Sequence, residues 1–459
     1  MTRPAIKRQD QLHAPYRRWP QIAVLGWGCV LVAALFAMSA ASLGGRAVIS
    51  IKGLDPQYYF GTAHALLFHH DFDLRSELQT LKPVETGGAA WRFRSPNGLP
   101  GSPYAIGYSI LSVPFLAAGT AIDALSGRPA DGYSAAAIFC YFLANVTFVA
   151  IGMVCLSRFL QRVGLAPWQA VFLTLAIWFS TTVGYYTFSP MSHASTFMMS
   201  AAFLLVWWQV KESDELTAWL SLGICGGLLS ICRWQDVLFL LAPPLYELVG
   251  RRRLVALWKW CAYCAAAVLC WVPQIAQWKE IYGRYLTNPQ GSRFLQFPPH
   301  FMAQVLLSSD HGWFVWTPIA VVGVAGLFCG ARKEAALYGP WIVVVALEVA
   351  VLGSIPNYWS GADSFGARSL TSCAPLIAWG TAVLISRAHR RAVKLLLGGF
   401  IGVCVVYTTL FAVQFRLDLI PRDGPLTMSQ LLWDKLSLKK AYQRRIHELR
   451  ESAPAQAAQ

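Results

Sequence analysis

Apolar segments close to 20 residues long recur along this chain and restrict its fold more than any other feature. One runs from Gln21 to Leu43 and another from 392 to 414, and short basic stretches separate them. A helix of that length spans the hydrocarbon core of a bilayer. The composition agrees, because 56% of the residues are hydrophobic and 13% are charged, whereas a soluble protein has about a quarter charged residues. The sequence therefore predicts an all-α polytopic membrane protein.

The basic residues give the chain a formal net charge of +15. They gather in short loops between apolar runs, where Lys and Arg set topology and attract anionic lipid headgroups. No zinc motif or basic–aromatic stripe accompanies them, so the lipid bilayer is the expected partner and nucleic acid is not. Almost all of the 11 cysteines fall inside apolar runs. We therefore predict no disulfide framework, and expect Cys261 and Cys264 to lie on a lipid-buried helix without a metal.

Loop charges predict the topology. Residues 1–20 are polar and basic, and the run after them is too long for a signal-peptide core, so we expect a cytoplasmic N-terminus and an uncleaved first span. Residues 46–132 then form a long first outer loop. Within it, 104–125 is apolar but is predicted not to cross, because the downstream basic clusters all face the cytoplasm only in that arrangement. About eleven crossings result: 21–43, 133–157, 168–187, 193–210, 216–232, 236–249, 254–275, 313–330, 335–355, 369–386 and 392–414.

The division into regions follows from these spans. Residues 21–414 form the transmembrane module, and 415–459 form a C-terminal tail expected outside. The tail carries basic residues that argue for the opposite side, but long tails are weaker topology signals than short loops. We predict an amphipathic helix from Leu426 to about Leu438 on the outer membrane surface, followed by a disordered end rich in Ala and Gln.

Polar elements concentrate on the predicted outer face, whereas the inner loops are short and merely basic. Function is therefore expected outside. The outer elements are the first loop, the turns 187–193 and 233–236, the loop 276–312 and the segment 357–368.

Asp55 lies just beyond the first span, within Ile51–Phe60. A carboxylate at that depth reaches a lipid headgroup and a water-soluble acceptor together. The structural alternative is equally simple, because Asp followed by Pro56 is a normal helix start, with Asp capping free N–H groups. The residues that follow have the spacing of an amphipathic helix over 56–70.

Two arginines are candidates for binding an anionic group. Arg233 lies between two apolar runs, where an ionisable side chain faces a cavity, snorkels to the surface or pairs with Asp236. Arg368 closely follows Gly366, and a glycine permits close approach of the backbone to a ligand. The planar fork of an arginine suits phosphate.

Histidines and tryptophans at the ends of spans favour structural roles. His193 and His311 are expected to act as hydrogen-bond donors. The adjacent His69 and His70 do not share a helix face, so with His64 they predict no metal site. An interfacial aromatic belt is predicted for most of the tryptophans at span ends: Trp313, Trp316, Trp341 and Trp359.

Three stretches together resemble a known family: Asp55 after the first span, Ser-Pro-Tyr-Ala-Ile-Gly-Tyr-Ser at 102–109, and Trp-Ser-Gly-Ala-Asp-Ser-Phe-Gly-Ala-Arg at 359–368. They resemble the GT-C fold membrane glycosyltransferases, in the bacterial branch related to protein O-mannosyltransferases (glycosyltransferase family 39) and lipid A aminoarabinose transferase. The resemblance covers most of residues 20–415. It implies a GT-C-like bundle with juxtamembrane helices in the first extracytoplasmic loop.

The resemblance also implies an activity. Such enzymes transfer a sugar from a polyprenyl-phosphate donor to an extracytoplasmic acceptor, here a glycan, lipid or protein at the cell (inner) membrane. By resemblance, Asp55 is the general base or orients the acceptor, and Arg368 and Arg233 face the donor phosphate. The full set of substrate-binding candidates is Arg368, Arg233, Arg94, His193, Tyr104, Asp363 and Trp359.

The chain departs from the family pattern at three positions. Pro56 follows Asp55 where O-mannosyltransferases have Glu, Ser189 stands where many relatives carry a second acid, and Ala367 replaces Pro before Arg368. Because one clear acidic ligand remains, we expect no cofactor and no divalent metal at this site.

Two other functions remain open from the sequence. A transporter or flippase for a lipid-linked or anionic substrate often has internal repeats with paired broken helices, and this chain shows no such repeat. A non-catalytic subunit of an envelope glycan pathway is the other alternative, which the missing second acid keeps open.

Overall fold

The computed structural model describes residues 19–40, 42–43, 46–47, 51, 53–81, 95–213, 215–251, 257–356, 359–361, 363–438 and 442–443. Helices make up this part of the chain apart from loops and one antiparallel pair of two-residue strands, β1 (Ser42–Leu43) and β2 (Arg46–Ala47). The predicted all-helical class is thus confirmed. The basic N-terminus before residue 19, Arg94 and the end of the tail lie outside the described residues.

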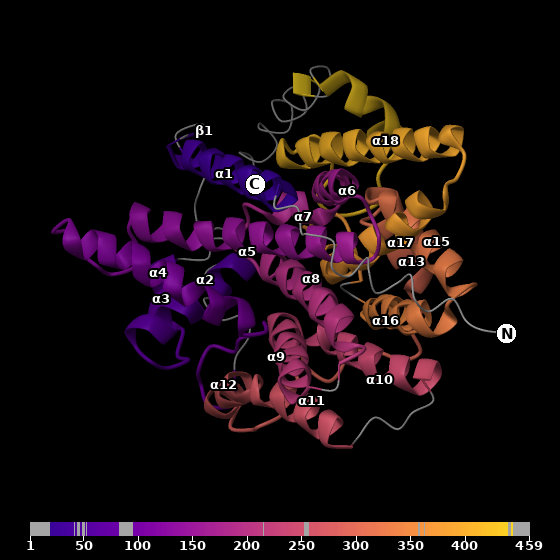
Figure 1. The fold of residues 1–459 in the computed structure, drawn as a ribbon. Helices are drawn as coiled ribbons and strands as arrows, with labels where there is room; N and C mark the ends of the chain where they lie inside the picture. The colour runs from indigo at the N-terminus through magenta and orange to yellow at the C-terminus, as the bar shows by residue number, and fades with distance from the viewer. Residues whose placement is uncertain are drawn as a thin grey trace.

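Five described helical segments are long and apolar enough to cross a membrane, which supports a helical membrane protein. The longest, α5 and α18, lie on opposite sides of α6 in the view of Figure 1. The five segments are α4 (Gly107–Leu125), α5 (Ala135–Arg162), α16 (Ala335–Gly353), η4 with α17 (Arg368–Cys373 and Ala374–Arg387) and α18 (Arg391–Arg416).

Other helices occupy the remaining predicted spans and part of the predicted loop 276–312, so helices are found in every predicted span, while the number of crossings remains a prediction. They are α1 (Trp19–Ala40), α6 (Pro167–Ser180), α7 (Thr182–Tyr186), α8 (His193–Val210), α9 (Leu216–Cys232), η2 (Trp234–Leu241), α10 (Ala242–Tyr246), η3 (Glu247–Arg251), α11 (Leu257–Leu269), α12 (Val272–Tyr282), α13 (Met302–Leu307), α14 (Trp313–Trp316) and α15 (Ile319–Ala331).

Several predicted spans are broken rather than continuous. The span predicted over 236–249 consists of a 3₁₀ segment, one α-turn and a π-turn around Pro243 and Pro244. Pro318 lies in the break between α14 and α15. Proline lacks the N–H that a continuing helix needs and clashes with the preceding turn. The two predicted spans therefore contain breaks that the hydrophobic pattern alone does not reveal, and whether they cross the membrane remains a prediction.

The first outer loop holds helices α2 (Leu54–Phe68) and α3 (Arg75–Leu81). The prediction of an amphipathic helix is wrong for α2, because every residue from Pro56 to Ala65 is buried. Aromatic packing explains this: the ring of Phe60 contacts that of Tyr133, which lies just before α5, and that of Tyr141, which lies within α5. The helix is therefore enclosed by protein and is a rigid base for the side chains that it carries.

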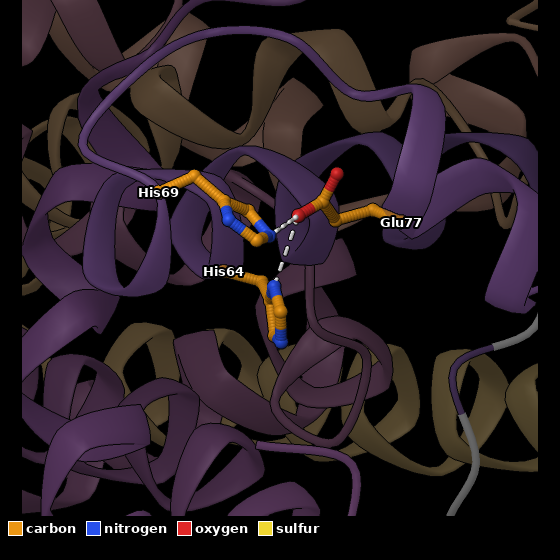
Figure 2. A group of neighbouring side chains, drawn as sticks. All are labelled: His64, His69 and Glu77. Atoms are coloured by element: carbon orange, nitrogen blue, oxygen red, sulfur yellow. Dashed lines mark hydrogen bonds and ion pairs between the residues drawn. The ribbon is translucent and has the colours of Figure 1, made fainter. Parts of the chain in front are cut away.

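Glu77 joins α3 to α2 and is fully buried (Figure 2). Its carboxylate oxygens contact the Nδ1 atom of His64 at 3.0 Å and accept a hydrogen bond from the hydroxyl of Ser76 at 2.8 Å.

The segment 95–106 is irregular, as its Pro and Gly residues predict, and α4 begins at Gly107. Helix α4 packs closely along α5, since a Cβ atom at Gly119 would lie 2.6 Å from the Cα atom of Ala137. Its 19 residues are long enough to cross a bilayer, so the non-crossing assignment of 104–125 remains a prediction.

Burial overturns the expectation of an aromatic belt for three tryptophans. Trp313, Trp316 and Trp341 are all at least 95% buried and belong to the protein core. In the C-terminal tail, two contiguous helical turns, η5 (Ser429–Trp433) and η6 (Asp434–Ser437), occupy the range of the predicted amphipathic helix, whose location on the membrane surface remains a prediction. They pack on α18 (Figure 1), where Leu431 joins a cluster with Phe411.

Candidate functional site

Five of the predicted site residues line one cavity of about 490 Å³. They come from α2, the segment before α4, the start of α8, the end of α9 and the start of η4. The residues are Asp55, Tyr104, His193, Arg233 and Arg368. The long-range assembly that the sequence predicted for them is therefore observed.

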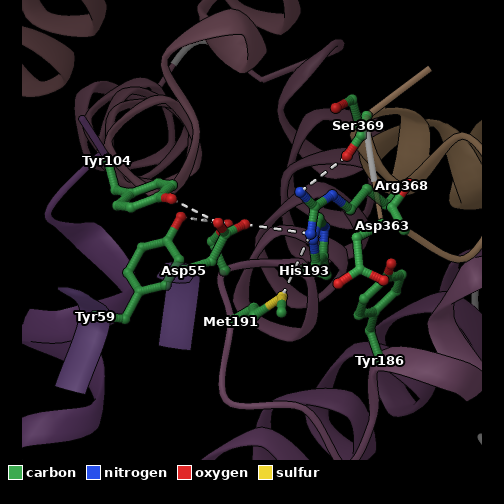
Figure 3. A network of polar contacts seen from close by, with 12 residues as sticks. Asp55, Tyr59, Tyr104, Tyr186, Met191, His193, Asp363, Arg368 and Ser369 are labelled. Atoms are coloured by element: carbon green, nitrogen blue, oxygen red, sulfur yellow. Dashed lines mark hydrogen bonds and ion pairs between the residues drawn. The ribbon is translucent and has the colours of Figure 1, made fainter. Parts of the chain in front are cut away.

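Asp55 lies in the first turn of α2, after Gly53. Gly53 has φ 86°, a conformation that only glycine adopts without strain, and it turns the chain into the helix. No side chain caps this helix start, so the capping role considered for Asp55 is not the one observed. The hydroxyl of Tyr104 donates to one carboxylate oxygen at 2.5 Å, and Nη1 of Arg368 lies 3.2 Å from the other (Figure 3).

Arg368 is held by the tight loop that precedes it. Gly366 has φ 61°, and its carbonyl accepts a hydrogen bond from the backbone N–H of Arg368 at 2.7 Å. The Nη2 atom of Arg368 donates to the carbonyl of Gly361 at 3.1 Å. Tyr186 fixes the loop from outside, since its hydroxyl accepts from the N–H of Phe365 at 2.8 Å. The glycine predicted to admit a ligand thus serves a turn that aims the guanidinium at Asp55.

Arg233 is the residue at which α9 ends, and its backbone is extended. Its Nη2 atom donates to the hydroxyl of Ser369 at 2.9 Å, and its Nη1 atom lies 3.4 Å from Nδ1 of His193. The alternatives considered for Arg233 were a side chain that faces a cavity, one that snorkels to the surface and one that pairs with Asp236. The first of these is observed. Two guanidinium groups and one carboxylate border the same space.

Tyrosines form the wall beside Asp55. The ring of Tyr104 packs on that of Tyr59 at 5.1 Å, and the hydroxyl of Tyr59 donates to Ser192 at 3.0 Å. Burial raises the pKa of Tyr59 well above its usual value, so this phenol remains a protonated donor.

A further part of the lining is apolar, and the sequence did not predict it. It includes Trp271 and Trp278 around α12 together with Val351, Leu352 and Ile355 at the end of α16. The two tryptophans are seven positions apart, which places them on one face of a helix, but this spacing is equally typical of ordinary packing. Ser369 was also missed, although it directly follows Arg368.

Two of the described candidates, Asp363 and Trp359, are not among the lining residues of the cavity. Asp363 is exposed and pairs with Arg422 at 3.1 Å, so its role in substrate binding remains a prediction. Trp359 stacks on Phe301 with ring centroids 6.2 Å apart, outside the lining residues. Arg94 lies outside the described residues.

The cavity offers acid–base and anion-binding chemistry rather than a ready metal centre. Asp55 is the single carboxylate among the described residues that line it. In the described part of the chain, the one group of His, Cys, Asp and Glu side chains able to share an ion lies at the other end of α2. A carboxylate beside guanidinium groups can accept a proton while the arginines hold an anion.

No protein-family model, no curated protein and no solved structure matches this chain. The class that the fold defines is therefore a helical membrane protein, and the cavity is the basis for its function.

Proposed function

We propose that this protein is a glycosyltransferase that moves a hexosyl or pentosyl group from a polyprenyl-phosphate donor to an acceptor on the extracytoplasmic face of the membrane. The observation that carries the proposal is the convergence of Asp55 with Arg368 and Arg233 on one cavity. The short motifs that resemble GT-C enzymes support it, because they contribute Asp55, Tyr104 and Arg368 to that cavity.

Asp55 acts as the general base. A sugar hydroxyl is a poor nucleophile, so a carboxylate in a partly dry cleft accelerates the reaction by accepting its proton during attack on the anomeric carbon. Without substrate, Asp55 is paired with Arg368. A donor phosphate that binds Arg368 competes for this pair and leaves the carboxylate oriented by Tyr104.

The two arginines stabilise the leaving group. A polyprenyl phosphate is already acidic, so its departure needs positive charge more than a proton donor. Arg368 presents its fork beside the base, and Arg233 extends the positive charge across Ser369. Direct displacement by the acceptor hydroxyl inverts the anomeric centre.

The walls of the cavity match an amphiphilic donor. The apolar lining residues Trp271, Trp278 and Leu352 suit a prenyl chain, while other lining residues carry the charged groups. Asn288 and Gln290 from the loop after α12 add polar groups at this site, suited to sugar hydroxyls.

A transfer assay tests the proposal. Purified protein in lipid is given a panel of radiolabelled polyprenyl-phosphate sugars, and turnover is compared between wild type, Asp55→Asn and Asp418→Asn. Asp418 is the matched control, an exposed carboxylate paired with Arg422. We expect one donor to be consumed, with a loss of about 10²- to 10⁴-fold for Asp55→Asn and no loss for the control.

Two results would reject the proposal. Full turnover by a folded Asp55→Asn protein would show that Asp55 is not the general base. Tight binding of a donor with no turnover by wild type would favour transport or a non-catalytic role instead.

A further inference from the structure

The far end of α2 carries a second polar cluster, which the proposed reaction does not use. His64 and His69 come from the last turn of α2 and its end, and Glu77 comes from α3 (Figure 2). One potential ligand atom of each residue lies within 4.8 Å of the others. Asp55 is nine residues away from His64, or about 14 Å along the helix, so the two clusters are separate sites.

Both histidines present a ring nitrogen to the same carboxylate oxygen. Nδ1 of His64 lies 3.0 Å and Nε2 of His69 lies 3.3 Å from Oε1 of Glu77. Zinc ligands at 2.0–2.1 Å in a tetrahedron are separated by roughly 3.3 Å. Two of the three donor pairs therefore already stand at nearly this separation, and all three donors lie within 4.8 Å of one another.

The second nitrogen of His64 shows which atom is available to an ion. Nε2 lies 2.8 Å from the backbone carbonyl of Asp131, an acceptor. A neutral imidazole has one N–H, so a proton donated to that carbonyl leaves a lone pair on Nδ1, opposite the Glu77 carboxylate. Nδ1 of His64 and the carboxylate oxygen of Glu77 are then two acceptors that face each other, unless a second proton or a cation lies between them. A backbone carbonyl on the other nitrogen is the usual partner of a histidine that binds a metal.

The surroundings hold the ring in this orientation. It stacks on Phe68 and packs against Tyr133, with centroids 4.4 Å and 4.5 Å apart. Gly132, with φ 80°, leaves the space for this packing, because a Cβ atom there would lie 3.0 Å from Cδ2 of His64. Ser76 holds the other oxygen of Glu77. The ligand set is thus preorganised on both sides.

We propose that His64, His69 and Glu77 bind a divalent transition-metal ion, with zinc as the ion that best fits two imidazoles and one carboxylate. Water fills the fourth position, because the side chain of His69 is 45% exposed and opens the site to solvent. The ion fastens α3 to α2 and thereby steadies the helix that carries Asp55.

The sequence predicted no metal here because His69 and His70 diverge. That argument holds for the adjacent pair, but His64 is the partner that the turn after α2 brings to His69.

Zinc titration of the full chain tests this site. The protein in lipid nanodiscs is stripped with a chelator, and zinc is added in competition with a chromophoric indicator. The variants are His69→Gln and, as the matched control, His70→Gln. His70 is the neighbouring exposed histidine, whose ring contacts only the carbonyl of Leu66 among the hydrogen bonds of the described residues. Because His69 is half-exposed, its replacement leaves the fold intact, which circular dichroism checks.

We expect wild type and His70→Gln to bind one zinc per chain and to melt at a higher temperature with zinc. His69→Gln should bind at least tenfold more weakly and gain no thermal stability. Equal affinity of His69→Gln and wild type, or no stoichiometric zinc in wild type, would overturn the proposal.

A thiol control excludes the main alternative ligands. All eleven cysteines are free thiols, so the titration is repeated after alkylation. Unchanged stoichiometry supports the nitrogen and oxygen donor set, whereas loss of binding on alkylation contradicts it. The result is independent of the proposed transferase activity, since no substrate is present.

Discussion

The two ends of α2 carry polar clusters that were assembled in opposite ways. At the start of the helix, Asp55 meets Tyr104 and Arg368, which come from distant parts of the chain. At its end, His64 meets Glu77 only 13 positions away. The sequence predicted the distant assembly and missed the local one. Closeness in sequence therefore did not decide which contact was predictable.

The difference lies in what each cluster requires. The residues at the Asp55 end each carry a chemical signal, such as an acid or an arginine beside an apolar run, and they all lie on the predicted outer face. The histidine cluster depends on the direction of one turn, in which His70 adopts φ 59° and α3 folds back toward α2. A single such dihedral is not visible in a pattern of residue types.

The clusters also differ in their exposure to solvent. Asp55 and Arg368 line a cavity and form an ion pair that a substrate can replace. Glu77 is fully buried and contacts two histidines. The first arrangement is suited to a reaction and the second to holding helices together. The following changes test this distinction.

Replacing Arg368 should have the largest effect. Arg368→Gln removes the charge beside Asp55, and we expect turnover to fall by roughly 10²- to 10³-fold, about 2.7–4 kcal/mol of transition-state stabilisation. Arg368→Lys keeps the charge but loses the planar fork, so part of the activity should return. Steady-state kinetics with the donor identified by the panel measure both. Equal turnover by Arg368→Gln and wild type would show that the charge in this cavity is not used in the reaction.

Removing the proposed zinc ion should affect the end of α2 that carries His64. At a free zinc concentration 100 times the dissociation constant, we expect the ion to stabilise the folded protein by about 2.7 kcal/mol. Chelation should lower the melting temperature, while the turnover of chains that remain folded should change less than twofold. The assignment of separate roles to the two ends of α2 would be contradicted by a melting temperature that does not change when chelator is added. Loss of turnover on chelation at a temperature where the protein stays folded would contradict it as well.

Tyr104→Phe should have a moderate effect. It removes the hydroxyl that donates to Asp55 at 2.5 Å and keeps the ring that packs on Tyr59. A hydrogen bond to a charged group contributes about 1.5–3 kcal/mol, so we expect a loss of roughly 10-fold or more in turnover with an unchanged melting temperature. Tyr282→Phe is the matched control, since its hydroxyl bonds the carbonyl of Ser102 instead.

Asp363→Asn should have the smallest effect. The sequence placed this carboxylate in the site, whereas in the structure it is exposed and pairs with Arg422. An exposed pair contributes at most about 1 kcal/mol, so we expect turnover within twofold of wild type. A large loss would restore the sequence-based assignment and place Asp363 in substrate binding.

The fold was predictable where the signal is local. Helices lie in every apolar range predicted as a span, and the bounds of α8 and α9 agree with the predicted 193–210 and 216–232. The breaks near Pro243 and Pro318 were not predicted, because the hydrophobic run continues across a proline that interrupts the hydrogen bonds. The burial of α2 was not predicted either, since it depends on the aromatic partners of Phe60.

The site was predictable in its reactive residues but not in its walls. Asp55, Arg233 and Arg368 stand out because charges beside apolar runs are costly and need a reason. Trp271 and Trp278 do not stand out, because tryptophan is common at membrane boundaries. Whether such a ring lines a cavity or fills the core is a property of the packed bundle.

The sequence by itself determined the helical membrane class and the residues able to do chemistry, because hydrophobic length and side-chain charge belong to each segment separately. Only the tertiary structure decided that Asp55 pairs with Arg368, that Asp363 turns away, and that His64 and His69 share Glu77. Those contacts depend on how segments pack against one another. A shift of one helical turn, about 5.4 Å, is enough to separate any of these partners.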